Sequence, residues 1–288
     1  MSRRLFFTAA VAALVALCAV SCATQTVIYE KASRHGPVIV TQGQDGLRTL
    51  LFEHGGARQS VVKPGDPDHL ELQYARVAMI GLALCGEPRR ILVVGLGGGT
   101  IPTFLRRHYP NARIDAVEIN SEVVEVAKKF FGFREDALMQ VHVADGRRFI
   151  ESITGPVYDA IFLDAFGAES VPAALATQEF LGAVRRALLP GGVVIGNVWN
   201  RTVNRLYDSM VRTYQEVFDE LFIIDVAHDV NKIVLALPRR QPLGQGELAQ
   251  MARTVSTERA FRFDLGDLVN FGFLHARERN PDGRALRD

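Results

Sequence analysis

Three carboxylates in the sequence follow apolar runs that are long enough to form buried strands. Glu118 ends "RIDAVE", Asp145 follows "MQVHVA", and Asp164 ends "DAIFLD". Ligands of an open α/β sheet bind beyond the carboxyl ends of its strands, so these side chains can meet one ligand there. Glu118 can bind both hydroxyls of a ribose, and Asp145 can accept a hydrogen bond from an adenine amino group, with Gly146 leaving room for the ring. The alternative for each carboxylate is a structural role as the cap of the following turn or helix.

A glycine cluster lies in "ILVVGLGGGTIP", residues 91–102, between an apolar run and a helix-compatible run. Gly95, Gly97 and Gly99 lack the side chains that would keep a ligand from the backbone, and amides at a helix start can bind one. The dinucleotide fingerprint requires a further glycine where Thr100 stands, so a nicotinamide cofactor is disfavoured. Glycines alone can also form a tight structural turn. Together with Glu118 and Asp145 at the next two strand ends, they favour a nucleoside site.

An alternation of strands and helices is expected to position these residues. Residues 27–62 contain short β-prone runs broken by Gly, Asp and His-Gly-Gly, which predict a small antiparallel sheet. "HLELQYARVAMIGLAL", residues 69–84, has the spacing of a helix, and strand-helix pairs follow it. Ser121 opens one of these helices, and Thr177 opens another that stops at a "PGG" sequence. Apolar strands that alternate with amphipathic helices predict a parallel sheet covered on both faces.

The end of the sheet departs from this alternation. In "ELFIIDVAHDVNKIVLALP", residues 220–238, only "AHDVN" separates two strands, and so short a connection requires an antiparallel hairpin. The predicted fold class is therefore α/β, a methyltransferase-like (Rossmann-like) parallel sheet with a C-terminal antiparallel hairpin. A small antiparallel β-domain over 26–63 is expected before a nucleoside-binding transferase domain over 64–240, with 241–288 as a C-terminal extension.

The first 25 residues have the organisation of an export signal. Arg3 and Arg4 precede an uncharged run from Leu5 to Thr24 that ends in small residues. The start resembles a twin-arginine signal, which directs the export of folded proteins, and "AVSC" resembles a lipoprotein cleavage box with Cys22 as the lipidated residue. Because about 20 apolar residues can span a bilayer, an uncleaved membrane anchor is the alternative. The protein is expected to be exported or membrane-anchored through this segment, with a cytoplasmic location as the alternative.

Composition and cysteine count exclude several classes of function. The chain of 288 residues is 48% hydrophobic, enough to bury a full core, and its formal net charge of +1 gives no general attraction to nucleic acid. Two of its three cysteines, Cys18 and Cys22, lie in the N-terminal segment. Cys85 is left alone in an apolar stretch, which predicts a buried, inert thiol and neither a disulfide framework nor a metal site.

At the residues described above, the sequence resembles the polyamine aminopropyltransferases, the spermidine synthase family, from Val27 to about Pro238. The family joins a small N-terminal β-domain to a methyltransferase-like domain. The resemblance implies a homodimer or homotetramer, decarboxylated S-adenosylmethionine as co-substrate and a small-molecule amine as acceptor. It also implies roles for the matching residues: Gln59, Glu118, Asp145 and Gly146 contact the nucleoside, Tyr74 contacts the amine, and Asp164 binds substrate as the catalytic aspartate.

The part of the site that would bind the amine departs from the family pattern. Relatives carry an aspartate in the glycine loop, a histidine after the tyrosine and a second aspartate after the catalytic one, where this chain has Gly98, Ala75 and Gly167. The missing acidic groups hold a dicationic amine in the family. The residues proposed to take their place are Asp66, Asp68 and Glu169.

The retained residues predict displacement at a carbon attached to a sulfonium. The thioether is a good leaving group, so the enzyme must align donor and acceptor and present an amine that is unprotonated. Asp164 is expected to bind the ammonium, take or relay its proton and direct the lone pair at the carbon. The predicted function is aminopropyl transfer to a diamine such as putrescine, giving spermidine and methylthioadenosine. The alternatives are an S-adenosylmethionine-dependent methyltransferase and a non-catalytic, nucleoside-binding exported lipoprotein.

Overall fold

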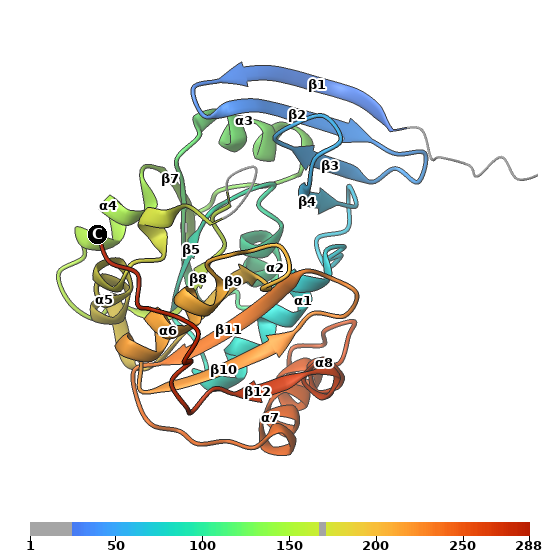
Figure 1. Cartoon of the computed structure of the whole chain (residues 1–288). Helices are drawn as coiled ribbons and strands as arrows, with labels where there is room; N and C mark the ends of the chain where they lie inside the picture. The colour runs from blue at the N-terminus through green and yellow to red at the C-terminus, as the bar shows by residue number, and fades with distance from the viewer. Residues whose placement is uncertain (1–24, 167–170) are drawn as a thin grey trace, which may run out of the picture.

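The largest element of the structure, a computed structural model that describes residues 25–166 and 171–288, is an eight-stranded sheet (Figure 1). Its strands lie in the order β12-β10-β11-β9-β8-β5-β6-β7. They are β5 (Arg90–Val94), β6 (Arg113–Glu118), β7 (Met139–Val143), β8 (Tyr158–Leu163), β9 (Leu188–Trp199), β10 (Glu220–Asp225), β11 (Asn231–Leu237) and β12 (Phe273–His275). Strands β9 to β7 are parallel, whereas β11, β10 and β12 pair antiparallel. The predicted fold class is confirmed.

Helices cover both faces of this sheet. They are α1 (Gln73–Ala78), η1 (Met79–Leu84), α2 (Thr100–His108), α3 (Ser121–Phe130), α4 (Gly146–Glu151), η2 (Ala173–Leu175), α5 (Gln178–Ala187), α6 (Tyr207–Val217), α7 (Gln245–Glu258) and α8 (Leu265–Phe271). Side chains alternate along β5, so Ile91 and Val93 join the core under α1, α2, α7 and α8. Leu92 and Val94 join the core under α4, α5 and α6. Burial on both faces explains why the central strands are apolar throughout.

A four-stranded antiparallel sheet lies next to helix α3 (Figure 1). Its strands pair in sequence order: β1 (Thr26–Ser33), β2 (Gly36–Gln42), β3 (Arg48–Leu51) and β4 (Arg58–Val62). Val38, Val40 and Leu50 of this small sheet pack against Val123 and Val126 of α3. The packing holds the small sheet beside the loop that connects β6 to α3.

Capping side chains set the starts of two helices, and Thr177 caps one as predicted, whereas Asn120 caps the other in place of Ser121. Oδ1 of Asn120 accepts a hydrogen bond of 3.0 Å from the Glu122 amide, so Ser121 is the first residue of α3. Oγ1 of Thr177 accepts one of 3.3 Å from the Phe180 amide at the start of α5.

The segment predicted as one helix over 69–84 contains two shorter ones. Helix α1 begins at Gln73, and Met79–Leu84 form the 3-10 helix η1, every residue of which is buried. A Cβ on Gly81 would lie 2.3 Å from Cγ1 of Ile195, so the backbone lies directly on the sheet. The apolar spacing of this segment therefore reflects burial on all sides, and close packing replaces the single amphipathic helix.

The C-terminal part of the chain returns to the large sheet. Helices α7 and α8 pack on η1, and β12 pairs with the edge of β10. The chain then crosses α6 and α5, where the Leu286 amide donates to Oγ1 of Thr213 (2.9 Å) and the Leu286 carbonyl accepts from the Gln178 amide (2.8 Å). This path brings Asp288 beside α4 (Figure 1).

The predicted export signal or membrane anchor lies outside the described residues, apart from Gln25. Over residues 25–166 and 171–288, no helix combines the length and the apolar character needed to cross a bilayer.

Candidate active site

A cavity of about 610 Å³ opens at the carboxyl ends of the parallel strands, and both sheets contribute to its walls. It brings together eight of the predicted site residues: Gln59, Tyr74, Gly95, Gly97, Glu118, Asp145, Gly146 and Asp164. Gln59 comes from the small sheet, and the others come from α1, from the end of β6, from the start of α4 and from the turns after β5, β7 and β8. The volume suits a ligand of nucleoside size or larger.

Glu118 holds the glycine loop in place and also faces the cavity. Its Oε2 accepts a hydrogen bond of 3.1 Å from the Leu96 amide, and its Oε1 accepts one of 2.9 Å from the Asn120 amide. Burial raises the pKa of the Glu118 carboxyl, while the backbone amides directed at it act in the opposite direction. The loop between β5 and α2 is therefore ordered around this carboxylate.

Gly95 allows a close approach between two strand ends. Its φ is +96°, and a Cβ at this position would lie 2.4 Å from the carbonyl oxygen of Asp164. A side chain here would push the glycine loop away from the end of β8. The glycine thus keeps Asp164 next to the loop that is predicted to bind the nucleoside.

Gly99 does not line the cavity, which corrects its predicted role in binding. It has a φ of +73° and begins α2, and a Cβ on it would lie 2.7 Å from the Phe133 ring. Gly98 is equally restricted, because a Cβ there would lie 2.4 Å from the Phe131 ring and 2.7 Å from Oγ of Ser60. The aspartate that relatives carry at position 98 has no room in this loop. Packing therefore explains why Gly99 and Gly98 are glycines.

Asp145 caps a helix and also lines the cavity. Its Oδ1 accepts a hydrogen bond of 3.0 Å from the Arg148 amide and so caps α4, while the same residue lines the cavity. Gly146 follows it, and a Cβ there would lie 2.6 Å from Cγ1 of Val94. The structural alternative is thus true of Asp145, and its contact with an adenine amino group stays a prediction.

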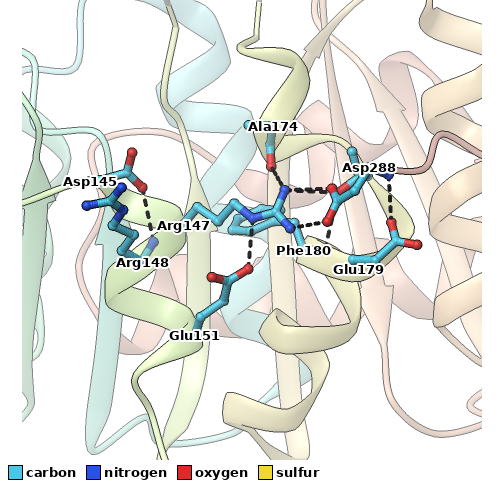
Figure 2. Close-up of polar contacts among 9 residues, drawn as sticks. Asp145, Arg147, Arg148, Glu151, Ala174, Glu179, Phe180 and Asp288 are labelled. Carbon is cyan, nitrogen blue, oxygen red and sulfur yellow. Dashed lines mark hydrogen bonds and ion pairs between the residues drawn. The ribbon is translucent and has the colours of Figure 1, made fainter.

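Arg147 connects the next turn of α4 to the C-terminal segment (Figure 2). Its guanidinium donates two hydrogen bonds to the Asp288 carboxylate, one of them 2.7 Å, and it also donates to Glu151 (2.8 Å). A further bond of 3.2 Å goes to the carbonyl of Ala174, and Ala174 and Leu175 line the cavity. The carboxylates raise the pKa of the Arg147 guanidinium. Arg147 therefore ties a wall of the cavity to Asp288.

Asp164 accepts two hydrogen bonds from opposite sides. The Tyr74 hydroxyl donates to Oδ2 (3.1 Å), and Nδ2 of Asn197 donates to Oδ1 (2.8 Å). Desolvation raises the pKa of the Asp164 carboxyl to about 7, and the two donors limit that rise. Within the described residues both side-chain oxygens of Asp164 bind other side chains, and residues 167–170, which a turn cap would contact, lie outside them, so the structural alternative for Asp164 stays open. A carboxylate that titrates near neutrality is suited to accept a proton.

The sequence interpretation missed four cavity residues near Asp164. They are Asn197 and Trp199 from β9, and Asp229 and Asn231 from the hairpin between β10 and β11. Asn197 had a signal, since it is a polar residue inside the apolar run "GGVVIGNVW". The hairpin residues had none, because only the fold brings that loop to the cavity.

The predicted substitutes for the missing acidic groups lie elsewhere or outside the described residues. Both carboxylate oxygens of Asp66 accept from Arg262 (2.8 Å each), and Oδ1 of Asp68 pairs with His108 (3.0 Å). Neither lines the cavity, whereas Asp229 does. Glu169 and Gly167 lie outside the described residues.

Cys85 is the free cysteine of the described ranges. Cys85 is half-buried, and burial raises the pKa of its thiol to about 12, as expected for an inert thiol. Among residues 25–166 and 171–288, no three His, Cys, Asp or Glu side chains gather into a group that could hold a metal ion.

The family model for the spermine/spermidine synthase domain matches residues 73–223. The chain belongs to the spermidine synthase family. A polyamine aminopropyltransferase from Vibrio vulnificus (strain CMCP6) is 34% identical over 269 residues, which cover 91% of this chain and 89% of that protein. The structure of a probable spermidine synthase from Corynebacterium glutamicum has a TM-score of 0.70 at 20% identity, covering 92% of this chain and 96% of the other, and so supports the fold.

A second kind of relative is a methyltransferase. The eEF1A lysine and N-terminal methyltransferase of Mus musculus is 37% identical over 214 residues, which cover 68% of this chain but only 30% of that longer protein. The protein is therefore an enzyme of the superfamily that contains spermidine synthases and methyltransferases.

Proposed function

We propose that the protein transfers an aminopropyl group from decarboxylated S-adenosylmethionine to a diamine such as putrescine. The observation that carries this proposal is the position of Asp164, a carboxylate with a pKa near 7 beside the glycine loop and in the same cavity as Glu118 and Asp145. The 34% identity to a polyamine aminopropyltransferase over most of both chains supports it.

The residues of the cavity divide between the two substrates. Glu118 receives the ribose hydroxyls and Asp145 the adenine amino group, with Gly146 leaving room for the ring. The acceptor amine lies at Asp164, where its ammonium gives up a proton to the carboxylate. The amine nitrogen then forms a bond to the methylene carbon next to the sulfonium as the carbon–sulfur bond breaks, and methylthioadenosine leaves.

Tyr74 and Asn197 donate hydrogen bonds that stabilise the ionised form of Asp164, which accepts the proton in this step. Burial and the neighbouring Asp164 hold the pKa of Tyr74 well above its usual range, so its hydroxyl stays a hydrogen-bond donor. Asp229 lines the same cavity and supplies negative charge for the second ammonium of a diamine. It takes the place of the acidic groups that the chain lacks at Gly98 and Gly167.

The test is the release of methylthioadenosine by the purified protein supplied with decarboxylated S-adenosylmethionine and putrescine. Asp164→Asn, prepared in parallel, controls for contaminating activity. Methylthioadenosine formed by the wild type and not by Asp164→Asn supports the proposal. Absence of release with putrescine, cadaverine, spermidine and diaminopropane contradicts it.

A methyltransferase is the second candidate, and two observations favour it. The chain has no acidic side chain at Gly98, and a methyltransferase is 37% identical over 214 residues. A methyltransferase binds the donor that keeps its carboxylate. Comparing the affinities for S-adenosylmethionine and its decarboxylated form by calorimetry discriminates between the two candidates.

For location and assembly, we propose export or anchoring through residues 1–25 and association into a homodimer or homotetramer. The first part rests on Arg3 and Arg4 before an uncharged run, and the second on family resemblance. A donor made in the cytoplasm would have to leave bound to the folded protein, which a twin-arginine route permits. Cell fractionation with the mass of the mature N-terminus, and light scattering of the purified protein, test these two points.

A further inference from the structure

A chain of buried amides reaches Asp164 from the C-terminal hairpin. Asn231, the first residue of β11, donates a hydrogen bond of 2.6 Å from Nδ2 to Oδ1 of Asn197. Nδ2 of Asn197 in turn donates to Oδ1 of Asp164 at 2.8 Å. Asn231 and Asn197 are 8% and 6% exposed, so water has little access to either amide.

The direction of this chain follows from the chemistry of a carboxamide. Asn197 has one acceptor atom and one donor group at the end of its side chain. Because Asn231 directs a donor at the oxygen, the NH₂ group of Asn197 must point to Asp164. An NH₂ group stabilises an ionised carboxylate, whereas a carbonyl oxygen there would stabilise the protonated acid.

We propose that Asn231 is a positioning residue that acts on Asp164 through Asn197 and favours its ionised form. Asn231 belongs to the antiparallel hairpin and pairs with Trp199 across β11 and β9, so the hairpin of β10 and β11 also sets the proton affinity of the residue that follows β8. The role of Asp164 as proton acceptor rests on the proposed function, but its ionisation can be measured without turnover.

Other groups around Asp164 act on the same equilibrium and must be held constant. Tyr74 donates to Oδ2 from α1, Asp229 faces the cavity from the hairpin loop, and Glu118 and Asp145 line it from the ends of β6 and β7. The basic side chains that line the same cavity within the described residues are Arg147, whose guanidinium binds Asp288, together with Arg58 of β4 and His35 of the turn between β1 and β2. Oδ1 of Asp229 accepts a hydrogen bond of 3.4 Å from the backbone amide of Asn231, and a substitution of the Asn231 side chain keeps that donor.

The experiment is a pH titration of the Asp164 carboxyl by ¹³C NMR in the full chain with labelled aspartate. The signal is assigned by its loss in Asp164→Asn. Asn231→Leu removes the donor that orients Asn197, and we expect it to raise the proton affinity of Asp164 about tenfold. Asn231→Asp should raise it further, because the new carboxylate draws the Asn197 NH₂ toward itself and turns the Asn197 oxygen to Asp164.

Two comparisons distinguish the effect of the Asn197 amide orientation on the proton affinity of Asp164 from the effect of an added negative charge. Val230→Asp adds a carboxylate to the neighbouring, exposed residue without touching Asn197, so it should raise the proton affinity less than Asn231→Asp. In a double-mutant cycle, Asn231→Leu should add nothing once Asn197 is replaced by Leu. Equal shifts in Val230→Asp and Asn231→Asp, or a full effect of Asn231→Leu without Asn197, would overturn the proposal.

If Asn231→Leu does not fold, Asn231→Ser is a smaller change at the same position. We expect Asn231→Ser also to raise the proton affinity of Asp164. A wild-type midpoint retained in both Asn231→Ser and Asn231→Asp also overturns the proposal. Failure of the proposed function is distinguishable, since it abolishes methylthioadenosine release in the wild type and leaves the titration unaffected. If release is observed, its rise with pH should move upward in parallel with the titration of each variant.

Discussion

The hydroxyl of Tyr74 donates a hydrogen bond of 3.1 Å to Oδ2 of Asp164, which joins helix α1 to the carboxyl end of strand β8. The bond stabilises the ionised carboxylate against the burial that raises its pKa. Tyr74→Phe removes it, so ionisation of Asp164 should then require a higher pH.

Asp164→Asn should separate nucleoside binding from turnover. The amide keeps the shape of the carboxyl but cannot accept a proton from the amine, so turnover should fall on the order of a hundredfold or more. Affinity for methylthioadenosine, measured by calorimetry, should hold because Glu118 and Asp145 are unchanged. Full turnover, or a loss of affinity as large as that of Asp145→Ala, would show that Asp164 is a binding residue.

The same substitution should make stability less dependent on pH. The folded pKa of Asp164, about 7, lies above that of an unfolded aspartate, so its protonation stabilises the fold at low pH. That contribution is complete below about pH 4 and is lost as pH rises through about 7. Asp164→Asn should therefore be more stable than the wild type at pH 8, by roughly 1 to 3 kcal/mol after allowing for solvent in the cavity, and not at pH 4. Urea unfolding at pH 4 and pH 8 measures the free energy of unfolding of both proteins. A difference between them that is the same at both pH values would contradict the raised pKa assigned to Asp164.

Asp145 variants should separate its cap from its contact with the nucleoside. Asp145→Asn can still cap α4 through its oxygen, but it directs an NH₂ group at the adenine amino group. Its stability should stay near that of the wild type, while nucleoside binding weakens by roughly 1 to 3 kcal/mol. Asp145→Ala should also lose about 1 kcal/mol of stability with the cap. Thermal unfolding measures the loss of stability, and calorimetry with methylthioadenosine measures the loss of affinity. Equal affinities for Asp145→Asn and the wild type would contradict the proposed contact between Asp145 and the adenine.

Removing the bond between Asp288 and Arg147 should weaken nucleoside binding from outside the cavity. Asp288→Asn loosens the guanidinium that binds the Ala174 carbonyl, and the dissociation constant of methylthioadenosine should rise roughly two- to fivefold, as expected for a solvent-exposed ion pair. Asp219→Asn breaks a similar exposed pair with Arg185 away from the cavity and serves as control. If Asp288→Asn and Asp219→Asn bind methylthioadenosine with equal affinity, the bond between Asp288 and Arg147 does not contribute to nucleoside binding.

Restoring the aspartate of relatives at position 98 should destabilise this protein. Gly98→Asp places a Cβ within 2.4 Å of the Phe131 ring, and the resulting overpacking should cost about 1 to 3 kcal/mol of the free energy of unfolding. Gly191→Asp is the matched control, since nothing lies within 4 Å of a Cβ there. Urea unfolding compares them, and equal stability would mean that Phe131 moves aside at no cost.

The sequence predicts much of the part of the cavity that we propose to bind the nucleoside, because its signals are local. A strand that is apolar throughout ends where a polar residue follows, so Glu118, Asp145 and Asp164 mark strand ends directly. Parallel strands deliver all their carboxyl ends to one edge, and such a sheet therefore gathers these residues without further information. The hairpin was predictable for a similar reason, since five residues cannot cross over a sheet.

Only the tertiary structure decided which partner each polar side chain meets. Asp66 looked available for an amine until Arg262, distant in sequence, was seen to bind it, and Gly99 packs on Phe133 instead of a ligand. Asn231 reaches Asp164 only because β11 inserts between β10 and β9. The periodicity and spacing of apolar residues along the sequence determine which face or end of a helix or strand a residue occupies. Partner choice depends on how those elements pack, because contacts between segments distant in the chain form only when the core assembles.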